Sequence, residues 1–266
     1  MNSEFATPRS AATVIIVRDA PTAPEVFMVR RHSRAVFASH FVFPGGVLDP
    51  CDTEVHDRAS GVDATTANAR LGLQQGALDY YSAAIREAFE ESGVLLARTS
   101  QGDWALQDLS AEEIVDYRER LHDGSLAWSV FLRQHDLHPL YEALHYVDYW
   151  VTPRIEARRF STRFFLARMP DGQIARHDDS ELTDSRWLPA AEVLAAGQRG
   201  EMKLMMPTEM NLQHIARQPT MESLLEWARN RATETNIQLP PAFADDTDRF
   251  TVVMPGSPDY PDDVDR

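Results

Sequence analysis

The segment Arg86-Glu87-Ala88-Phe89-Glu90-Glu91-Ser92-Gly93-Val94 places three glutamates within little more than one helical turn. Residues three and four positions apart share a helix face, so Glu87, Glu90 and Glu91 are expected to project together. Apolar residues recur at helical spacing around them, and Ser92-Gly93 is typical of a helix end. An exposed acidic face with an Arg86–Glu90 pair would stabilise the helix by only about 0.5 kcal/mol. The segment alone therefore indicates either a surface helix or a site that requires concentrated negative charge.

A Pro-Gly-Gly turn upstream favours the second interpretation. Pro44 interrupts strand pairing, and Gly45-Gly46 allow the backbone to approach other groups closely. Carboxylate and carbonyl oxygens are the ligands that Mg²⁺ and Mn²⁺ prefer, and Mg²⁺ is commonly held between a few carboxylates and a substrate phosphate. The turn and the helix together predict a divalent-metal site for a phosphate-containing substrate.

These residues resemble the signature of the Nudix hydrolase family, G-x5-E-x7-R-E-U-x-E-E-x-G-U, in which U is a bulky apolar residue. Residues 86–94 match the second half, although Ala88 is smaller than the usual aliphatic residue. Gly46 matches the first position, and Asp52 stands where the family has Glu. The spacing then differs, because 33 residues separate Asp52 from Arg86 where the family has seven. Loop closure costs little for added length, so we expect the glutamate cluster to survive the insertion, while the partner of Arg86 stays open.

The resemblance also implies a fold of the α/β class, a Nudix α/β/α sandwich with a mixed β-sheet, an insertion inside the Nudix box and extra helices. We expect a single Nudix domain over residues 10–235, with the insertion at about 53–80 and the added helices at about 110–138. Residues 236–266 carry seven aspartates and two arginines. They are expected to form an acidic, solvated C-terminal tail.

Local patterns agree with a mixed sheet. Strands are predicted at residues 12–18, 26–30, 143–153 and 159–169, and the first two flank a Pro-rich turn and predict a hairpin. In the last of these strands, alternation would place Arg159, Ser161 and Arg163 on one face and the residues between them on the other.

Further motifs resemble the coenzyme-A diphosphatase branch of the family. The string Phe43-Pro44-Gly45-Gly46-Val47 follows Val29-Arg30-Arg31 and Phe37, and residues 149–167 resemble the nucleoside-diphosphate-linked-moiety-X-motif-19 subgroup. The likeness covers roughly residues 12–215. It implies Mg²⁺- or Mn²⁺-dependent hydrolysis of a diphosphate bond in a nucleoside diphosphate linked to another moiety, with coenzyme A or acyl-CoA as the leading substrate. The alternatives are ADP-ribose, a dinucleotide or a nucleotide sugar as substrate, or a Nudix domain that binds a ligand without turnover.

The resemblance assigns roles to the acidic residues. The metal ligands would be Glu87, Glu90, Glu91 and the carbonyl of Gly46, and Arg86 would orient the cluster through charge-assisted hydrogen bonds. The base would be Glu87 or a carboxylate outside the helix. The acidic stretch 177–189, expected to be a loop, offers Glu181 for that role, and its alternatives are Asp178, Asp179 and Asp184.

A basic cluster in an otherwise acidic chain suggests where the substrate binds. Arg30, Arg31 and Arg34 lie together, and Arg163 lies on a predicted strand. Arginine forks suit a diphosphate and a 3′-phosphate. The competing interpretations are a solubilising strand end for the first three and a salt bridge for Arg163.

Bulk properties exclude several classes of function. The chain of 266 residues has a net charge of −15, which argues against nucleic-acid and anionic-membrane binding. No apolar run approaches the ~20 residues of a membrane span. Cys51 is the single cysteine, so we expect a reducing compartment and a cytoplasmic protein with a small-molecule diphosphate substrate. A homodimer is a further expectation, taken from the family alone.

Overall fold

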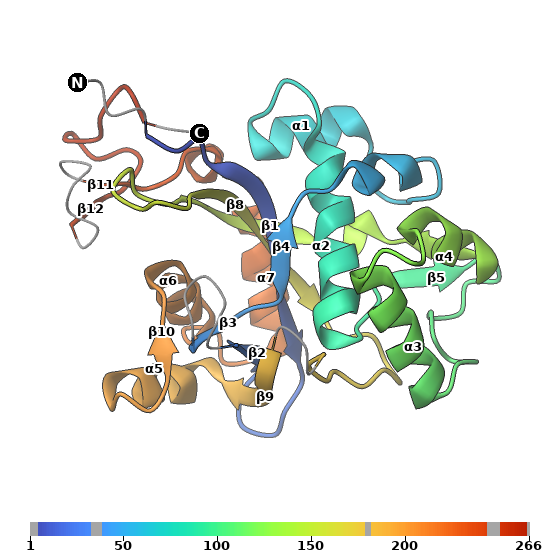
Figure 1. Cartoon of the computed structure of the whole chain (residues 1–266). Coiled ribbons are helices and arrows are strands. Elements are labelled where there is room, and N and C mark those ends of the chain that lie inside the picture. Colours follow the sequence, from blue (N-terminus) through green and yellow to red (C-terminus); the bar gives the residue numbers. More distant parts are fainter. Residues whose placement is uncertain (1–4, 33–38, 179–181, 244–250, 265–266) are drawn as a thin grey trace.

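The computed structural model describes residues 5–32, 39–178, 182–243 and 251–264. A mixed sheet of eight strands forms the middle layer of the fold (Figure 1). The strand order is β10-β3-β2-β1-β8-β7, and β4 and β9 pair with β1 and β2. The strands are β1 (Arg9–Arg18), β2 (Glu25–Arg31), β3 (His40–Val42), β4 (Gly45–Val47), β7 (His145–Val151), β8 (Phe160–Arg168), β9 (Leu182–Pro189) and β10 (Lys203–Leu204).

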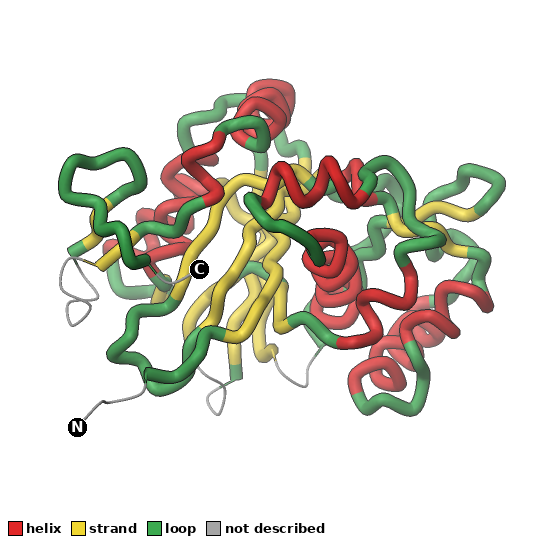
Figure 2. Tube along the Cα trace, turned by 90° about the horizontal axis from the view of Figure 1, so that it is seen from above, coloured by secondary structure: helices red, strands yellow, loops and turns green. Residues whose placement is uncertain are grey.

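Helices cover both faces of this sheet, as Figure 2 shows, so the predicted α/β/α sandwich is confirmed. One face packs against α1 (Ala64–Leu71), α2 (Ala77–Ser92), α3 (Ala111–His122) and α4 (Trp128–Gln134). The other face packs against α5 (Ala190–Gln198), α6 (Met206–Ile215) and α7 (Met221–Arg231). Short elements complete the chain: η1 (Pro50–Val55), β5 (Ala97–Thr99), β6 (Leu137–Pro139), η2 (Tyr141–Ala143), η3 (Thr235–Gln238), β11 (Ala242–Phe243) and β12 (Val252–Val253).

Strand β1 organises the two cores. Its side chains alternate, so that Val14 and Ile16 enter the core beneath α2 while Ile15 and Val17 enter the core beneath α5, α6 and α7. The predicted hairpin is confirmed, since Val17 pairs with Val26 in antiparallel register. Along its other edge β1 runs parallel to β8 from Arg9 to Val17.

The Pro-Gly-Gly turn feeds a further strand. Gly45–Val47 pair with the N-terminal half of β1 as strand β4, and Ala12 lies opposite Gly46. A Cβ atom on Gly45 would lie 2.4 Å from the carbonyl oxygen of Ala12, so a side chain has no room there. The turn therefore changes the pairing partner of the chain, from β2 to β1.

Two expectations about the C-terminal third are wrong. Residues 182–189 form strand β9, where a surface loop was expected. This strand pairs with the edge of β2 opposite the one that pairs with β1 and β3. The beginning of the C-terminal tail is not solvated: Ile237 is 2% and Ala242 is 5% exposed. The hydroxyl of Tyr146 also donates to the carbonyl of Ile237 at 2.6 Å. Among the described residues, no helix is both long and apolar enough to cross a membrane.

Gly93 ends helix α2 in the left-handed conformation, with φ 72° and its N–H donating to the carbonyl of Phe89 at 2.8 Å. We expect Gly93→Ala to lower the free energy of unfolding by about 1–2 kcal/mol, because a Cβ disfavours this conformation. The added Cβ would lie 3.5 Å from Arg118, an ordinary contact, so no clash contributes. Urea unfolding measures the change, and Gly93→Asn should lose less because Asn tolerates this conformation better. Equal losses for both variants would contradict the explanation.

Candidate active site

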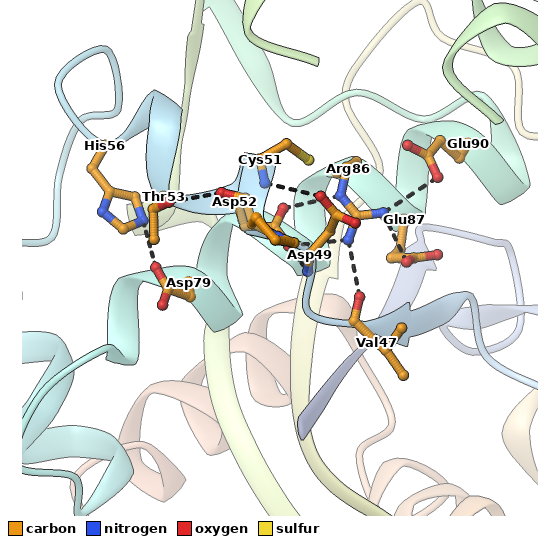
Figure 3. Close-up of polar contacts among 11 residues, drawn as sticks. Val47, Asp49, Cys51, Asp52, Thr53, His56, Asp79, Arg86, Glu87 and Glu90 are labelled. Carbon is orange, nitrogen blue, oxygen red and sulfur yellow. Dashed lines mark hydrogen bonds and ion pairs between the residues drawn. The ribbon is translucent and has the colours of Figure 1, made fainter. Parts of the chain in front are cut away.

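The guanidinium of Arg86 lies at the centre of the candidate active site, between η1, β4 and α2 (Figure 3). Its Nε and Nη2 donate to the two oxygens of Asp52 at 2.9 and 3.0 Å, and Asp52 is fully buried. Nη2 also donates to the carbonyl of Val47 at 3.0 Å. Nη1 donates to Glu87 at 2.8 Å and to Glu90 at 3.3 Å. The open question of the Arg86 partner is thereby answered: Asp52 is its bidentate ion pair.

Asp52 can pair with Arg86 because it lies in η1, directly after β4, and the inserted residues follow it in the chain. The carboxylates of Asp49 and Asp52 form a reciprocal cap at the start of η1, in which Asp52 accepts the N–H of Asp49 at 2.8 Å. The chain then forms α1 and returns to the start of α2. There Oδ1 of Asp79 lies 3.2 Å from Nε2 of His56. The insertion therefore closes on itself and leaves the pairing of Asp52 with Arg86 intact.

Close packing against the Gly-Gly turn holds two of the glutamates. A Cβ atom on Gly46 would lie 2.3 Å from Oε1 of Glu87, so only glycine lets this carboxylate lie against β4. Glu91 accepts the N–H of Gly45 at 2.8 Å and is 6% exposed. The turn and the helix thus place three carboxylates and a glycine backbone together, as the residues of a metal site would require.

Burial changes the acidity of Glu90. Removal from water raises its pKa to about 7, Arg86 acts in the opposite direction, and the negative charge of Glu87 adds to the rise. Glu90 thus carries a proton for part of the time at neutral pH in the absence of a bound divalent ion.

The donor chemistry fits a divalent ion, since the cluster consists of hard carboxylate oxygens beside a backbone carbonyl. Among the described residues, no three carboxylate, histidine or cysteine side chains already converge as a metal cage. The reason lies in the hydrogen bonds given above: Arg86 holds Glu87 and Glu90, and Gly45 holds Glu91. Binding of an ion would therefore require these side chains to turn from their present partners.

A cavity of about 820 Å³ adjoins the glutamates. The strands β4, β1, β8 and β7 are successive neighbours in the sheet, and Val47, Ala11, Thr162 and Trp150 lie in register across them. All four line the cavity. With neighbouring strands about 4.8 Å apart, the floor extends about 14 Å from the glycine turn to Trp150. The cavity thus has the three glutamates of α2 at one end and, at the other, a wall that contains aromatic and methionine side chains.

The structure separates the predicted substrate-binding arginines. Arg31 lines the cavity, and its Nη2 lies 3.5 Å from the carbonyl of Gly45. Arg30 is exposed and does not line the cavity. Arg163 is 2% exposed and stacks on the ring of Tyr149, with 3.4 Å from its guanidinium carbon to the ring centroid. The prediction for Arg163 is wrong, because alternation along β8 turns Phe164 towards the cavity and Arg163 into the core.

Two predicted site residues, Arg34 and Glu181, lie outside the described residues, as does Asp179, one of the alternatives to Glu181. Of the alternatives to Glu181, Asp178 lines the cavity and accepts the N–H of Leu182 at 3.0 Å. Asp184 lies on β9 and is hydrogen-bonded to Arg186 at 3.0 Å. Asp178 is therefore the described acidic residue from this stretch that lines the same cavity as the glutamates.

Sequence reasoning assigned no role to two residues that line the cavity. His122 reaches it from the last turn of α3, beside the glutamate-bearing helix. Trp150 lines the opposite end, and its indole N–H donates to Asp148 at 2.6 Å. The sequence held one signal for Trp150: a charged residue, Asp148, lies two positions before it within the otherwise apolar residues 146–151.

A carboxylate-rich helix packed on a Gly-Gly turn, within an α/β/α sandwich, defines a Nudix hydrolase. The family model described as "NUDT19 Nudix domain" matches residues 64–215, and the chain belongs to this family. Members of the wider family generally use divalent metal ions.

Individual relatives agree with this class. "Acyl-coenzyme A diphosphatase NUDT19" of Xenopus laevis is 24% identical over 275 residues, which cover 91% of this chain and 72% of that protein. The protein of the same name from Gallus gallus is 25% identical, over 100% of this chain and 83% of its own. The crystal structure of a NUDIX hydrolase from Alicyclobacillus acidocaldarius superposes with a TM-score of 0.71 at 28% identity, covering 84% of this chain and 97% of that one.

Removing the charge of Asp52 tests the ion pair that holds the site. We expect Asp52→Asn to lower the free energy of unfolding by about 3 kcal/mol or more, because the buried Arg86 would lose its fully buried bidentate partner and keep only the partly exposed Glu87 and Glu90. Urea unfolding measures the loss. Glu201→Gln, which breaks the exposed pair with Arg199, is the matched control and should leave the midpoint unchanged. Equal midpoints for both variants would show that the pair contributes nothing.

The raised pKa of Glu90 predicts a pH-dependent metal affinity. Protons and cations compete for this carboxylate, so Mn²⁺ should bind about ten-fold more weakly per unit of pH below 7, and with little further change above 8. Isothermal titration calorimetry between pH 5.5 and 8.5 measures the trend. Glu90→Gln should bind Mn²⁺ weakly and with a flatter pH profile. A wild-type affinity independent of pH across 7 would contradict the assignment.

Proposed function

We propose that the protein hydrolyses the diphosphate bond of coenzyme A and acyl-CoA with Mg²⁺ or Mn²⁺. The observation that carries the proposal is the cavity itself, with Glu87, Glu90 and Glu91 at one end and an apolar wall at the other. A diphosphate joined to a long, partly apolar moiety has the same two-ended character. The relatives' printed name, acyl-coenzyme A diphosphatase, supports the same choice.

The roles of the chain's own residues follow from their contacts. Glu87, Glu90 and Glu91, with the carbonyl of Gly46, would hold the ions. When bound, divalent ions would neutralise the diphosphate and lower the pKa of a water molecule. Arg86 keeps two of the glutamates on one side of the helix, and its own charge is balanced by Asp52.

Proton transfer and substrate orientation would involve the opposite walls. Water must lose a proton as its oxygen attacks one phosphorus and the bridging oxygen leaves with the other phosphate. Glu87 or Asp178 would accept that proton, since both line the cavity. Arg31 would donate to a phosphate oxygen near Gly45, whose carbonyl lies 3.5 Å from its Nη2. The products from coenzyme A would be 3′,5′-ADP and phosphopantetheine.

ADP-ribose, dinucleotides and nucleotide sugars are polar at both ends of the diphosphate. The apolar wall formed by Trp150, Phe160, Phe164 and Met206 offers such substrates little. It favours coenzyme A over these alternatives. A cytoplasmic location, consistent with the single cysteine, and a homodimer are part of the proposal and rest on no contact described above.

A panel of diphosphates with Mg²⁺ or Mn²⁺ tests the activity. Wild-type protein should convert coenzyme A to 3′,5′-ADP, measured by chromatography, and Glu90→Gln should lose at least ~100-fold in kcat, about 2.7 kcal/mol of barrier. Glu192→Gln, an exposed glutamate on α5, is the matched control and should retain activity. Turnover of ADP-ribose without coenzyme A would reject the substrate, and turnover of no diphosphate would reject the activity.

A further inference from the structure

Asp148 is a buried carboxylate that the proposed chemistry does not use. It is 8% exposed. The register between β7 and β8 shifts between Tyr146 and Asp148. One oxygen accepts the N–H of Tyr149 at 2.9 Å. The other accepts the indole N–H of Trp150 at 2.6 Å and the side-chain amide of Asn211 at 3.0 Å. Burial raises the pKa of Asp148 to about 6 against these hydrogen bonds, so the group is mostly ionised above neutral pH and its bonds are charge-assisted.

These bonds join three elements around one carboxylate. Trp150 belongs to β7 and Asn211 to α6, and Asn211 also donates to the carbonyl of Pro207 in the first turn of α6. Arg231 of α7 donates to the carbonyl of Val147 at 3.2 Å, and its positive charge acts against the rise in the pKa of Asp148. Breaking the contacts of Asp148 would therefore remove a polar link that holds Trp150 and α6 together.

Trp150 and the first turn of α6 form part of one wall of the cavity. Trp150, Met206 and Thr208 line it at the end opposite the glutamates, together with Phe164 from β8 and Phe243 from β11. Methionine and phenylalanine side chains suit a flexible apolar chain.

The charges at this end favour a neutral ligand. Two carboxylates, Glu156 and Glu209, line the cavity here. Among the described lining residues the one arginine, Arg31, lies beside Gly45 at the glutamate end. An additional phosphate, such as the 3′-phosphate of coenzyme A, would gain nothing from this surrounding. The pantetheine arm with its thioester-linked acyl group is neutral and fits.

We infer that Asp148 is a positioning residue for an acyl-arm subsite, in which it holds Trp150 and α6 against the acyl-pantetheine part of the substrate. The inference rests on the proposed function for the identity of the ligand. Asp148 itself touches no substrate. Its effect should therefore appear in acyl-chain discrimination rather than in the chemical step.

The test compares coenzyme A with dodecanoyl-CoA in wild type and Asp148→Asn. An amide at this position has one acceptor oxygen and no charge, so it cannot accept from Tyr149 on one side and from Trp150 and Asn211 on the other, and the wall should loosen. We expect the KM for dodecanoyl-CoA to rise about five-fold or more, with kcat and the KM for coenzyme A within about two-fold of wild type. Tyr146→Phe is the matched control: it removes two buried hydrogen bonds from the same strand, to Ile237 and from Arg163, but its side chain faces the other core. Tyr146→Phe should leave the ratio of the KM for dodecanoyl-CoA to the KM for coenzyme A unchanged.

Two additions keep the test decisive. Trp150→Phe retains an aromatic ring but lacks the N–H donor to Asp148, and it should reproduce the loss of discrimination if Asp148→Asn does not fold. Direct binding of dodecanoyl-pantetheine, which has no diphosphate, is measured by calorimetry. Wild type should bind it at least about five-fold more tightly than the variants.

The outcomes separate the two proposals. Hydrolysis of coenzyme A with equal effects of Asp148→Asn on both substrates, or an effect on kcat alone, would overturn the subsite and leave the activity standing. Absence of coenzyme A hydrolysis, with tight binding of dodecanoyl-pantetheine by wild type alone, would overturn the activity and support the subsite. Failure of wild type to bind dodecanoyl-pantetheine would overturn the subsite.

Discussion

The ion pair between Arg86 and Asp52 is the constraint on which the site depends. Two charges removed from water cost several kcal/mol, which their attraction offsets only when the remaining donors are satisfied. Here the spare donors of Arg86 meet Val47, Glu87 and Glu90. One guanidinium thereby fixes helix α2 against strand β4, so the glutamates lie beside the glycine backbone. Like-charged carboxylates can share one helix face because this cation lies among them.

A fork in the sheet creates the room for a substrate. Strand β1 pairs with β4 along its N-terminal half and with β2 along its C-terminal half, so the sheet divides at the glycine turn. The cavity floor then crosses β1 and β8 to Trp150. Strand alternation decides what faces it: Thr162 and Phe164 line the cavity, whereas Arg163 is buried against Tyr149 on the other face. Strand geometry, rather than charge, therefore selects which side chains can meet a ligand.

Much of this arrangement follows from local sequence. The β1–β2 hairpin, helix α2 and its end at Gly93 come from patterns within about 20 residues, which periodicity and stop signals describe well. The grouping of Glu87, Glu90 and Glu91 on one helix face is equally local. Strand β9 and the packed segment around Ile237 were not predictable in this way. Polar residues within β9 and the aspartates that follow the segment around Ile237 suggest solvent exposure. Partners far along the chain, β2 and Tyr146, override that signal.

By itself, then, the sequence determined that three carboxylates share a helix face behind a glycine turn, because helical period and glycine stereochemistry act within a few residues. Only the tertiary structure decided that Asp52 pairs with Arg86 across 34 positions, that Arg31 and Asp178 line the cavity while Arg163 does not, and that Asp148 joins β7 to α6. These contacts depend on strand register and on the closing of an insertion. Both are set by packing between distant segments, which no local pattern encodes.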